Sequence, residues 1–197
     1  MVPEAVRQRL HQVQGLITLG ESDRLAELAA EVPSWATIVE IGAHTGRSTL
    51  WLAAGSRAHV VTVDPWPEPG YAGDGDDPFD LGTGQAVLER FSDNLTKHGA
   101  WDRITALRMS SLEAARVWVN PIGLLFLDAV HQYQEVRDDC EAWLPKVTQG
   151  GVVALHDWFD DAEMTHPSGV ADAFLDVAGD QWEPLDMVDN LYAARRR

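Results

Sequence analysis

The chain has 197 residues and a formal net charge of −16 at pH 7. This charge argues against nucleic acids and anionic membrane surfaces as partners, because both are recognised by basic patches. One cysteine, Cys140, allows no internal disulfide and fits a reducing cytoplasm, and no apolar stretch approaches the length of a membrane span.

The length suits a single domain over residues 1–197. The first residues lack the apolar core of a signal peptide, which supports a cytoplasmic location. Residues 195–197 form the only cluster of lysine and arginine, and we expect them to be a frayed, solvated tail.

Residues 1–33 predict two helices ahead of the main fold. Apolar residues recur at helical spacing over 2–13, which indicates an amphipathic helix on the rim of a sheet. A second helix is expected over 23–32, with Ser22 as its N-cap.

From residue 34 onward, strands and helices alternate. The expected strands are 37–41, 59–63, 104–109, 122–127 and 151–155, and the expected helices are 48–54, 86–99, 112–117, 133–143 and 170–177. Residues 182–187 and 191–194 are typical of a closing hairpin. This order predicts an α/β fold with a doubly wound, mostly parallel sheet.

Two polar loops interrupt the alternation, at residues 65–85 and 158–167. Long loops in a compact domain are usually functional or mobile, so we expect the first to be a solvated lid, the second to be mobile, and both to shape the acceptor site. Trp66 and Tyr71 either face a ligand there or hold the first loop down.

A glycine turn follows the first strand, at residues 42–46. Strand, glycine turn and helix form the front of a nucleotide-binding βαβ unit. The second strand ends at Asp64, 22 residues after Gly42, a spacing that suits a ribose diol. The alternative is that Asp64 only caps a turn.

Two later strands stop at charged residues. The strand at 122–127 is followed by Asp128 and, three positions on, by His131, and the strand at 151–155 is followed by His156 and Asp157. Both sets belong at the carboxyl edge of the sheet, where ligands bind in open α/β folds. If the strands are neighbours, the four side chains converge. The alternative is that the carboxylates cap helices.

These motifs resemble those of class I S-adenosylmethionine-dependent methyltransferases from about residue 37 on, including Gly150-Gly151 before the fifth strand. The resemblance implies a Rossmann-like sheet of seven strands with an antiparallel last strand. It implies that the glycine turn holds the methionine part of the cofactor, with Glu40 near its ammonium and Asp64 on its ribose. It also implies that Trp66 or Pro65 flanks the adenine and that Ser111 lies near its amino edge. The implied cofactor-binding residues are Glu40, Gly42, Ala43, Thr45, Gly46, Ser48, Asp64, Trp66, Ser111 and Asp128.

One departure from the common pattern is His44, where many members have a glycine; the dinucleotide motif Gly-x-Gly-x-x-Gly is also absent.

A narrower resemblance is to the divalent-metal O-methyltransferases, such as catechol O-methyltransferase and the macrocin type that methylates sugar hydroxyls. It implies Asp128, His156 and Asp157 as ligands of Mg²⁺ or another divalent cation and His131 as general base. Some relatives carry an acidic residue in place of His156, and magnesium prefers oxygen ligands.

The expected activity is methyl transfer to a hydroxyl of a small molecule, preferably a sugar or glycoside. A homodimer is a compatible oligomeric state. A sugar hydroxyl is a weak acid, and a neutral imidazole is a suitable proton acceptor for it. The alternatives are a catechol or phenol O-methyltransferase, a metal-free cofactor-binding module, and a nicotinamide-dependent oxidoreductase.

Overall fold

The computed structural model describes residues 2–66, 84–159 and 169–197. They build one sheet of seven strands in the order β3-β2-β1-β4-β5-β7-β6. The strands are β1 (Thr37–Ile41), β2 (His59–Asp64), β3 (Ile104–Arg108), β4 (Ile122–Leu127), β5 (Val147–Leu155), β6 (Trp182–Val188) and β7 (Leu191–Arg196). Strand β7 runs antiparallel to β5 and β6, and the pairs among β1 to β5 are parallel. The predicted fold class is confirmed.

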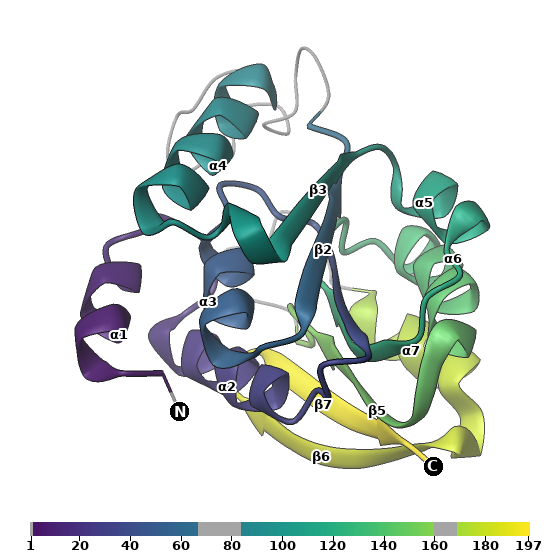
Figure 1. Ribbon diagram of the computed structural model, residues 1–197. Coiled ribbons are helices and arrows are strands. Elements are labelled where there is room, and N and C mark those ends of the chain that lie inside the picture. The colour runs from purple at the N-terminus through teal and green to yellow at the C-terminus, as the bar shows by residue number, and fades with distance from the viewer. Residues whose placement is uncertain (1, 67–83, 160–168) are drawn as a thin grey trace.

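Helices cover both faces of this sheet (Figure 1). They are α1 (Glu4–Leu10), α2 (Leu19–Ala30), α3 (Arg47–Gly55), α4 (Gly84–His98), α5 (Ser111–Val117), α6 (Tyr133–Trp143) and α7 (Val170–Ala178). Alternate residues of each strand point to opposite layers, so Ile38 packs with α1 to α4 and Val39 with α5 to α7. No helix in the described part of the chain is long and apolar enough to cross a membrane.

Helix α2 begins earlier than the sequence predicted. Its N-cap is Thr18, whose hydroxyl accepts the Glu21 N–H, while the Glu21 carboxylate accepts the Thr18 N–H. This reciprocal pair is a capping box, and it outcompetes the expected Ser22 cap. Ser22 lies inside the helix, where its hydroxyl donates to the Thr18 carbonyl oxygen at 2.6 Å.

The basic C-terminal residues are not a frayed tail. Arg195 and Arg196 belong to β7, and the Arg195 guanidinium bonds the Gly150 carbonyl and Glu31. Arg196 donates to the carbonyls of Pro145 and Val147.

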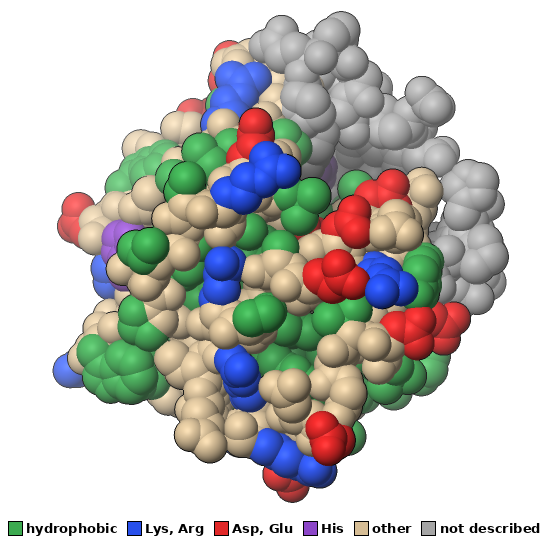
Figure 2. All heavy atoms as spheres, turned by 90° about the vertical axis from the view of Figure 1, so that its right-hand side faces the viewer, with side chains coloured by type: hydrophobic (Ala, Val, Ile, Leu, Met, Phe, Trp, Pro, Cys, Tyr) green, Lys and Arg blue, Asp and Glu red, His purple; other side chains and the backbone are tan. Residues whose placement is uncertain are grey.

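The face of the molecule that carries α5 to α7 has a mixed surface. Acidic, basic and apolar side chains are interspersed over its described part (Figure 2).

Strands β4 and β5 are neighbours, as the convergence of the four charged residues requires. Leu127 pairs with Leu155 in the parallel register, and the His156 N–H donates to the Leu127 carbonyl oxygen. Asp128 and His156 therefore leave the same edge of the sheet side by side. Most of the two predicted loops, at 67–83 and 160–167, lies outside the described residues, and so does Tyr71.

Candidate active site

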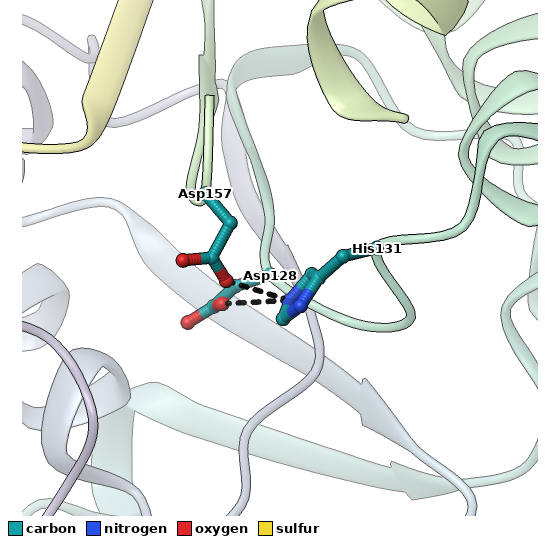
Figure 3. Close-up of side chains that lie close together, drawn as sticks. All are labelled: Asp128, His131 and Asp157. Atoms are coloured by element: carbon teal, nitrogen blue, oxygen red, sulfur yellow. Dashed lines mark ion pairs between the residues drawn. The ribbon is translucent and has the colours of Figure 1, made fainter. Parts of the chain in front are cut away.

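Four side chains converge at the carboxyl edge of β4 and β5. Nδ1 of His156 lies 3.1 Å from Asp128 Oδ1 and 3.0 Å from Asp157 Oδ2. Nε2 of His131 lies 2.9 Å from Asp157 Oδ2 and 3.9 Å from Asp128 Oδ1. Figure 3 shows both carboxylates turned toward the His131 ring. Asp128, His131 and Asp157 each offer one ligand atom within 4.8 Å of the others, a spacing that could hold a metal ion.

The two ring nitrogens face the carboxylates without making good hydrogen bonds. His131 Nε2 and His156 Nδ1 are buried and have no hydrogen-bond partner of acceptable geometry within the described ranges. Ligand atoms of an octahedral cation with bonds of about 2.1 Å lie about 3 Å apart and point at a shared centre. Three of the four separations at this cluster, from 2.9 to 3.1 Å, match such an arrangement, and the distance of 3.9 Å between His131 and Asp128 is longer.

Electrostatics couple the four groups. Burial lowers the pKa of His131, but the side chains of Asp128 and Asp157 outweigh it and raise that pKa to about 9. Burial raises the pKa values of Asp128 and Asp157, yet the two histidines hold both below their usual range. The two carboxylates therefore stabilise the protonated form of His131, and a cation bound at the cluster would take the place of that positive charge.

Glu21 is a member of this cluster that sequence reasoning missed. Its carboxylate is 1% exposed, and Oε2 lies 3.3 Å from His156 Nε2, on the far side of the ring from Asp128. The Thr18-x-x-Glu21 pattern could have marked Glu21 as a helix cap. No local pattern announces its contact with a residue 135 positions away.

The glycine turn brings β1 close to β4. Gly42 has φ 89°, and a Cβ there would lie 2.0 Å from the Asp128 carbonyl oxygen. Only glycine permits that approach. His44, which replaces the usual glycine, has φ 46°, a left-handed conformation in which histidine is enriched among side-chain-bearing residues.

Several non-glycine residues at this edge of the sheet have a left-handed backbone conformation. His44 (φ 46°), Trp66 (φ 37°) and Asp157 (φ 53°) all follow the carboxyl ends of strands in the described chain. Such conformations store strain and concentrate at functional sites.

Asp64 stabilises the glycine turn, as its alternative role as a turn cap predicted. It is fully buried, and Oδ2 accepts the N–H groups of Ala43 and His44 at 2.9 and 3.0 Å. Oδ1 accepts the Trp66 N–H at 2.8 Å. The ribose contact stays a prediction, now joined to a structural role.

Trp66 holds the chain down after β2. Its ring is fully buried against Phe91, and Nε1 donates to the His44 carbonyl oxygen at 3.0 Å. The structure thus supports the second of its two expected roles.

Three further residues that were predicted to bind the cofactor are buried in the protein. Glu40 is fully buried, and Oε2 accepts the Thr49 hydroxyl at 2.5 Å. Its Oε1 has no hydrogen-bond partner in the described residues, and burial raises the Glu40 pKa to about 7. Thr45 donates to the Gln14 carbonyl oxygen, while Ser48 is buried in α3.

Ser111 lies at the start of α5, beside α6. It donates its hydroxyl hydrogen to Asp139 and accepts the indole N–H of Trp143 at 2.7 Å. Its predicted place beside an adenine amino group is not tested by these contacts.

A hollow of about 660 Å³ lies at the amino edge of β4 and β5, opposite to the carboxyl edge that carries the candidate site. Its lining includes Trp118 and Lys146 and none of the predicted site residues.

Comparison with known proteins identifies a family model that matches most of the residues at this edge of the sheet. A model described as a methyltransferase domain matches residues 39–158, which include the glycine turn and all four converging side chains. The chain is also 31% identical over 126 residues to a protein of Sinorhizobium fredii described as uncharacterized protein y4gI. That match covers 61% of this chain and only 13% of the much longer relative.

Solved structures share the fold at low sequence identity. An O-methyltransferase from Bacillus cereus in complex with SAH aligns with a TM-score of 0.72 and 18% identity, over 99% of this chain and 92% of that one. The SAH-bound methyltransferase PaMTH1 from Podospora anserina aligns with a TM-score of 0.69 and 15% identity, over 100% and 89% of the two chains.

Proposed function

The chain belongs to the methyltransferase-domain family, and from that premise we propose that it moves the methyl group of S-adenosylmethionine to a hydroxyl oxygen, with a divalent cation bound. The observation that carries this proposal is the convergence of Asp128, His131, His156 and Asp157 beside the glycine turn. A methyl transfer to oxygen needs a place for the cofactor, a means to acidify the acceptor, and a proton acceptor.

The glycine turn is the proposed place for the cofactor. Its close approach to the end of β4 puts the turn next to Asp128. Glu40 supports the assignment, because its buried Oε1 is an acceptor that a cofactor ammonium could use directly or through a water. Both solved structures described above carry SAH, the product form of that cofactor.

The carboxyl edge is the proposed cation site, with Asp128, Asp157 and His156 as ligands. Two carboxylates and an inward-facing ring nitrogen fit a divalent ion, and each carboxylate has an oxygen about 3 Å from that nitrogen, which fits the ion's coordination sphere. When bound there, the ion supplies Lewis-acid charge that orients the acceptor oxygen and lowers its pKa.

His131 is the proposed general base. It is the most exposed of the four side chains, at 36%, so part of its ring borders solvent while Nε2 faces the two carboxylates. With a cation bound to Asp128 and Asp157, the interactions that raise the His131 pKa would weaken. Nε2, which faces the cluster, would then be placed to accept the proton of a hydroxyl held there. Methyl passes from sulfonium sulfur to oxygen, leaving S-adenosylhomocysteine.

The proposed acceptor is a sugar or glycoside hydroxyl. A sugar hydroxyl is less acidic than a phenol, so it gains more from an imidazole base beside a cation. A catechol or phenol is the second candidate, since histidine also serves more acidic hydroxyls.

A methyl-transfer assay with glycosides and catechols, each with and without EDTA, tests the proposal. We expect transfer to glycosides that stops on chelation and returns with Mg²⁺ or Mn²⁺. Preferential methylation of catechols would overturn the acceptor class. Transfer that persists after complete chelation would overturn the cation requirement.

A further inference from the structure

The Glu21–His156 contact joins helix α2 to the candidate cation site. Glu21 is held rigidly, because Oε2 accepts the Thr18 N–H at 2.7 Å and Oε1 accepts the Asn190 N–H at 2.9 Å. Its carboxylate is almost fully buried, and so is the imidazole of His156, which is 9% exposed. A buried carboxylate fixed by two backbone donors and 3.3 Å from a ring nitrogen strongly orients that ring.

The contact fixes the tautomer of His156 once a cation is bound. Carboxylates face both ring nitrogens, Asp128 and Asp157 at Nδ1 and Glu21 at Nε2. With a cation held by the two aspartates, the remaining ring proton belongs on Nε2, beside the acceptor-only carboxylate of Glu21. The neutral ring then presents the lone pair of Nδ1 to the side occupied by Asp128 and Asp157. Carboxylate–histidine–metal chains of this kind set the tautomer and raise the basicity of the ligand nitrogen.

The donor set that results mixes nitrogen with oxygen. Magnesium demands oxygen ligands, whereas imidazole with carboxylates suits Mn²⁺, Co²⁺, Ni²⁺ and Zn²⁺. His131 Nε2, 2.9 Å from Asp157 Oδ2, places a second imidazole nitrogen at the edge of the same cluster. The arrangement therefore departs from an all-oxygen magnesium site.

We propose that Glu21 is a positioning residue that presents Nδ1 of His156 to the cation, so that the site takes a first-row transition metal in preference to Mg²⁺. This inference rests on the proposed cation site. It adds to that site a metal class and a residue from α2, an element outside the region matched by the family model.

Direct binding of Co²⁺ and Mg²⁺ to the metal-free full chain tests the inference by calorimetry, with Co²⁺ absorption as a second readout. His156→Glu replaces the nitrogen ligand by oxygen and should lower the ratio of Co²⁺ to Mg²⁺ affinity at least about tenfold. Glu21→Gln should weaken Co²⁺ binding by about 10–100-fold, the usual effect of removing such a partner.

Thr18→Ala is the matched control, because it removes the other half of the capping box and leaves the His156 contact in place. It reports how far a weakened start of α2 alone affects metal binding, and we expect Co²⁺ affinity close to that of the parent. Nitrogen-15 spectra of the Zn²⁺-loaded parent should show His156 protonated at Nε2 and metal-bound at Nδ1.

Co²⁺ binding that is unaltered in Glu21→Gln, or altered equally in Thr18→Ala, overturns the positioning role. An affinity ratio unchanged in His156→Glu overturns the metal class. Either result leaves a cation-dependent methyltransferase standing. Failure of the parent to bind either ion overturns the inference and the cation requirement together.

Discussion

At the scale of single residues, His131 is the side chain through which the proposed chemistry can be tested most directly. It combines exposure to solvent with a contact to Asp157, whereas His156 is nearly buried. His131→Ala should lower the turnover number by about 10²–10⁴, the usual contribution of a general base. The affinity for S-adenosylhomocysteine, measured by calorimetry, should hardly change. An unchanged turnover number would contradict the assignment.

Asp64 carries a second prediction. Its carboxylate accepts three backbone N–H groups in the interior, so Asp64→Ala leaves buried donors unpaired. Each such donor costs about 1–3 kcal/mol, and we expect a clear loss in the free energy of unfolding along with weaker cofactor binding. Urea unfolding and calorimetry measure the two effects. Full stability in the variant would show that the turn does not depend on Asp64.

Glu40 predicts a pH dependence of stability. Its folded-state pKa of about 7 lies above the ordinary value, so its stabilising contribution is complete below the unfolded pKa and is lost as the pH rises through about 7. Glu40→Gln should therefore gain stability relative to the parent between about pH 5 and pH 8. Thermal unfolding across this range measures the difference. A difference independent of pH would mean that Glu40 is already ionised at about pH 5.

At the scale of elements, the turn after β1 packs closely against the end of β4 and so connects the proposed cofactor and cation sites. A Cβ at Gly42 would overlap the carbonyl of Asp128, so Gly42→Ala must push the ends of β1 and β4 apart. We expect loss of both cofactor and cation binding, or failure to fold. The matched control is Gly99→Ala, which also has positive φ (62°) but finds nothing within 4 Å, and which should cost only about 1–2 kcal/mol. Equal effects in both variants, measured by unfolding and calorimetry, would contradict this account.

At the scale of the whole molecule, the proposed cation joins the ends of two neighbouring strands. A ligand that binds only the folded state raises the unfolding temperature, so Mn²⁺ should raise it and EDTA should cancel the rise. Asp128→Ala and Asp157→Ala should abolish both this rise and methyl transfer. Glu135→Ala, an exposed carboxylate of α6, is the control that should keep both. A rise that survives in the two aspartate variants would place the cation elsewhere.

Much of the fold could be predicted from the chain alone, because strand and helix periodicity are local signals. The charged ends of β4 and β5 could be predicted as well, since a carboxylate that ends a buried strand belongs at the edge of a sheet. Ser22 shows the limit of local reasoning even within one helix, because the competing box at Thr18 and Glu21 decided where α2 begins.

The sequence by itself determined which residues stand at the ends of the strands, and so which chemistry is present. Only the tertiary structure decided that Asp64 is buried in the turn and that Glu21 stands behind His156. The physical reason is that these contacts join segments far apart in the chain. The Glu21 contact depends on how α2 and the turn of Asp189 and Asn190 pack against the edge of β5, which no local periodicity encodes.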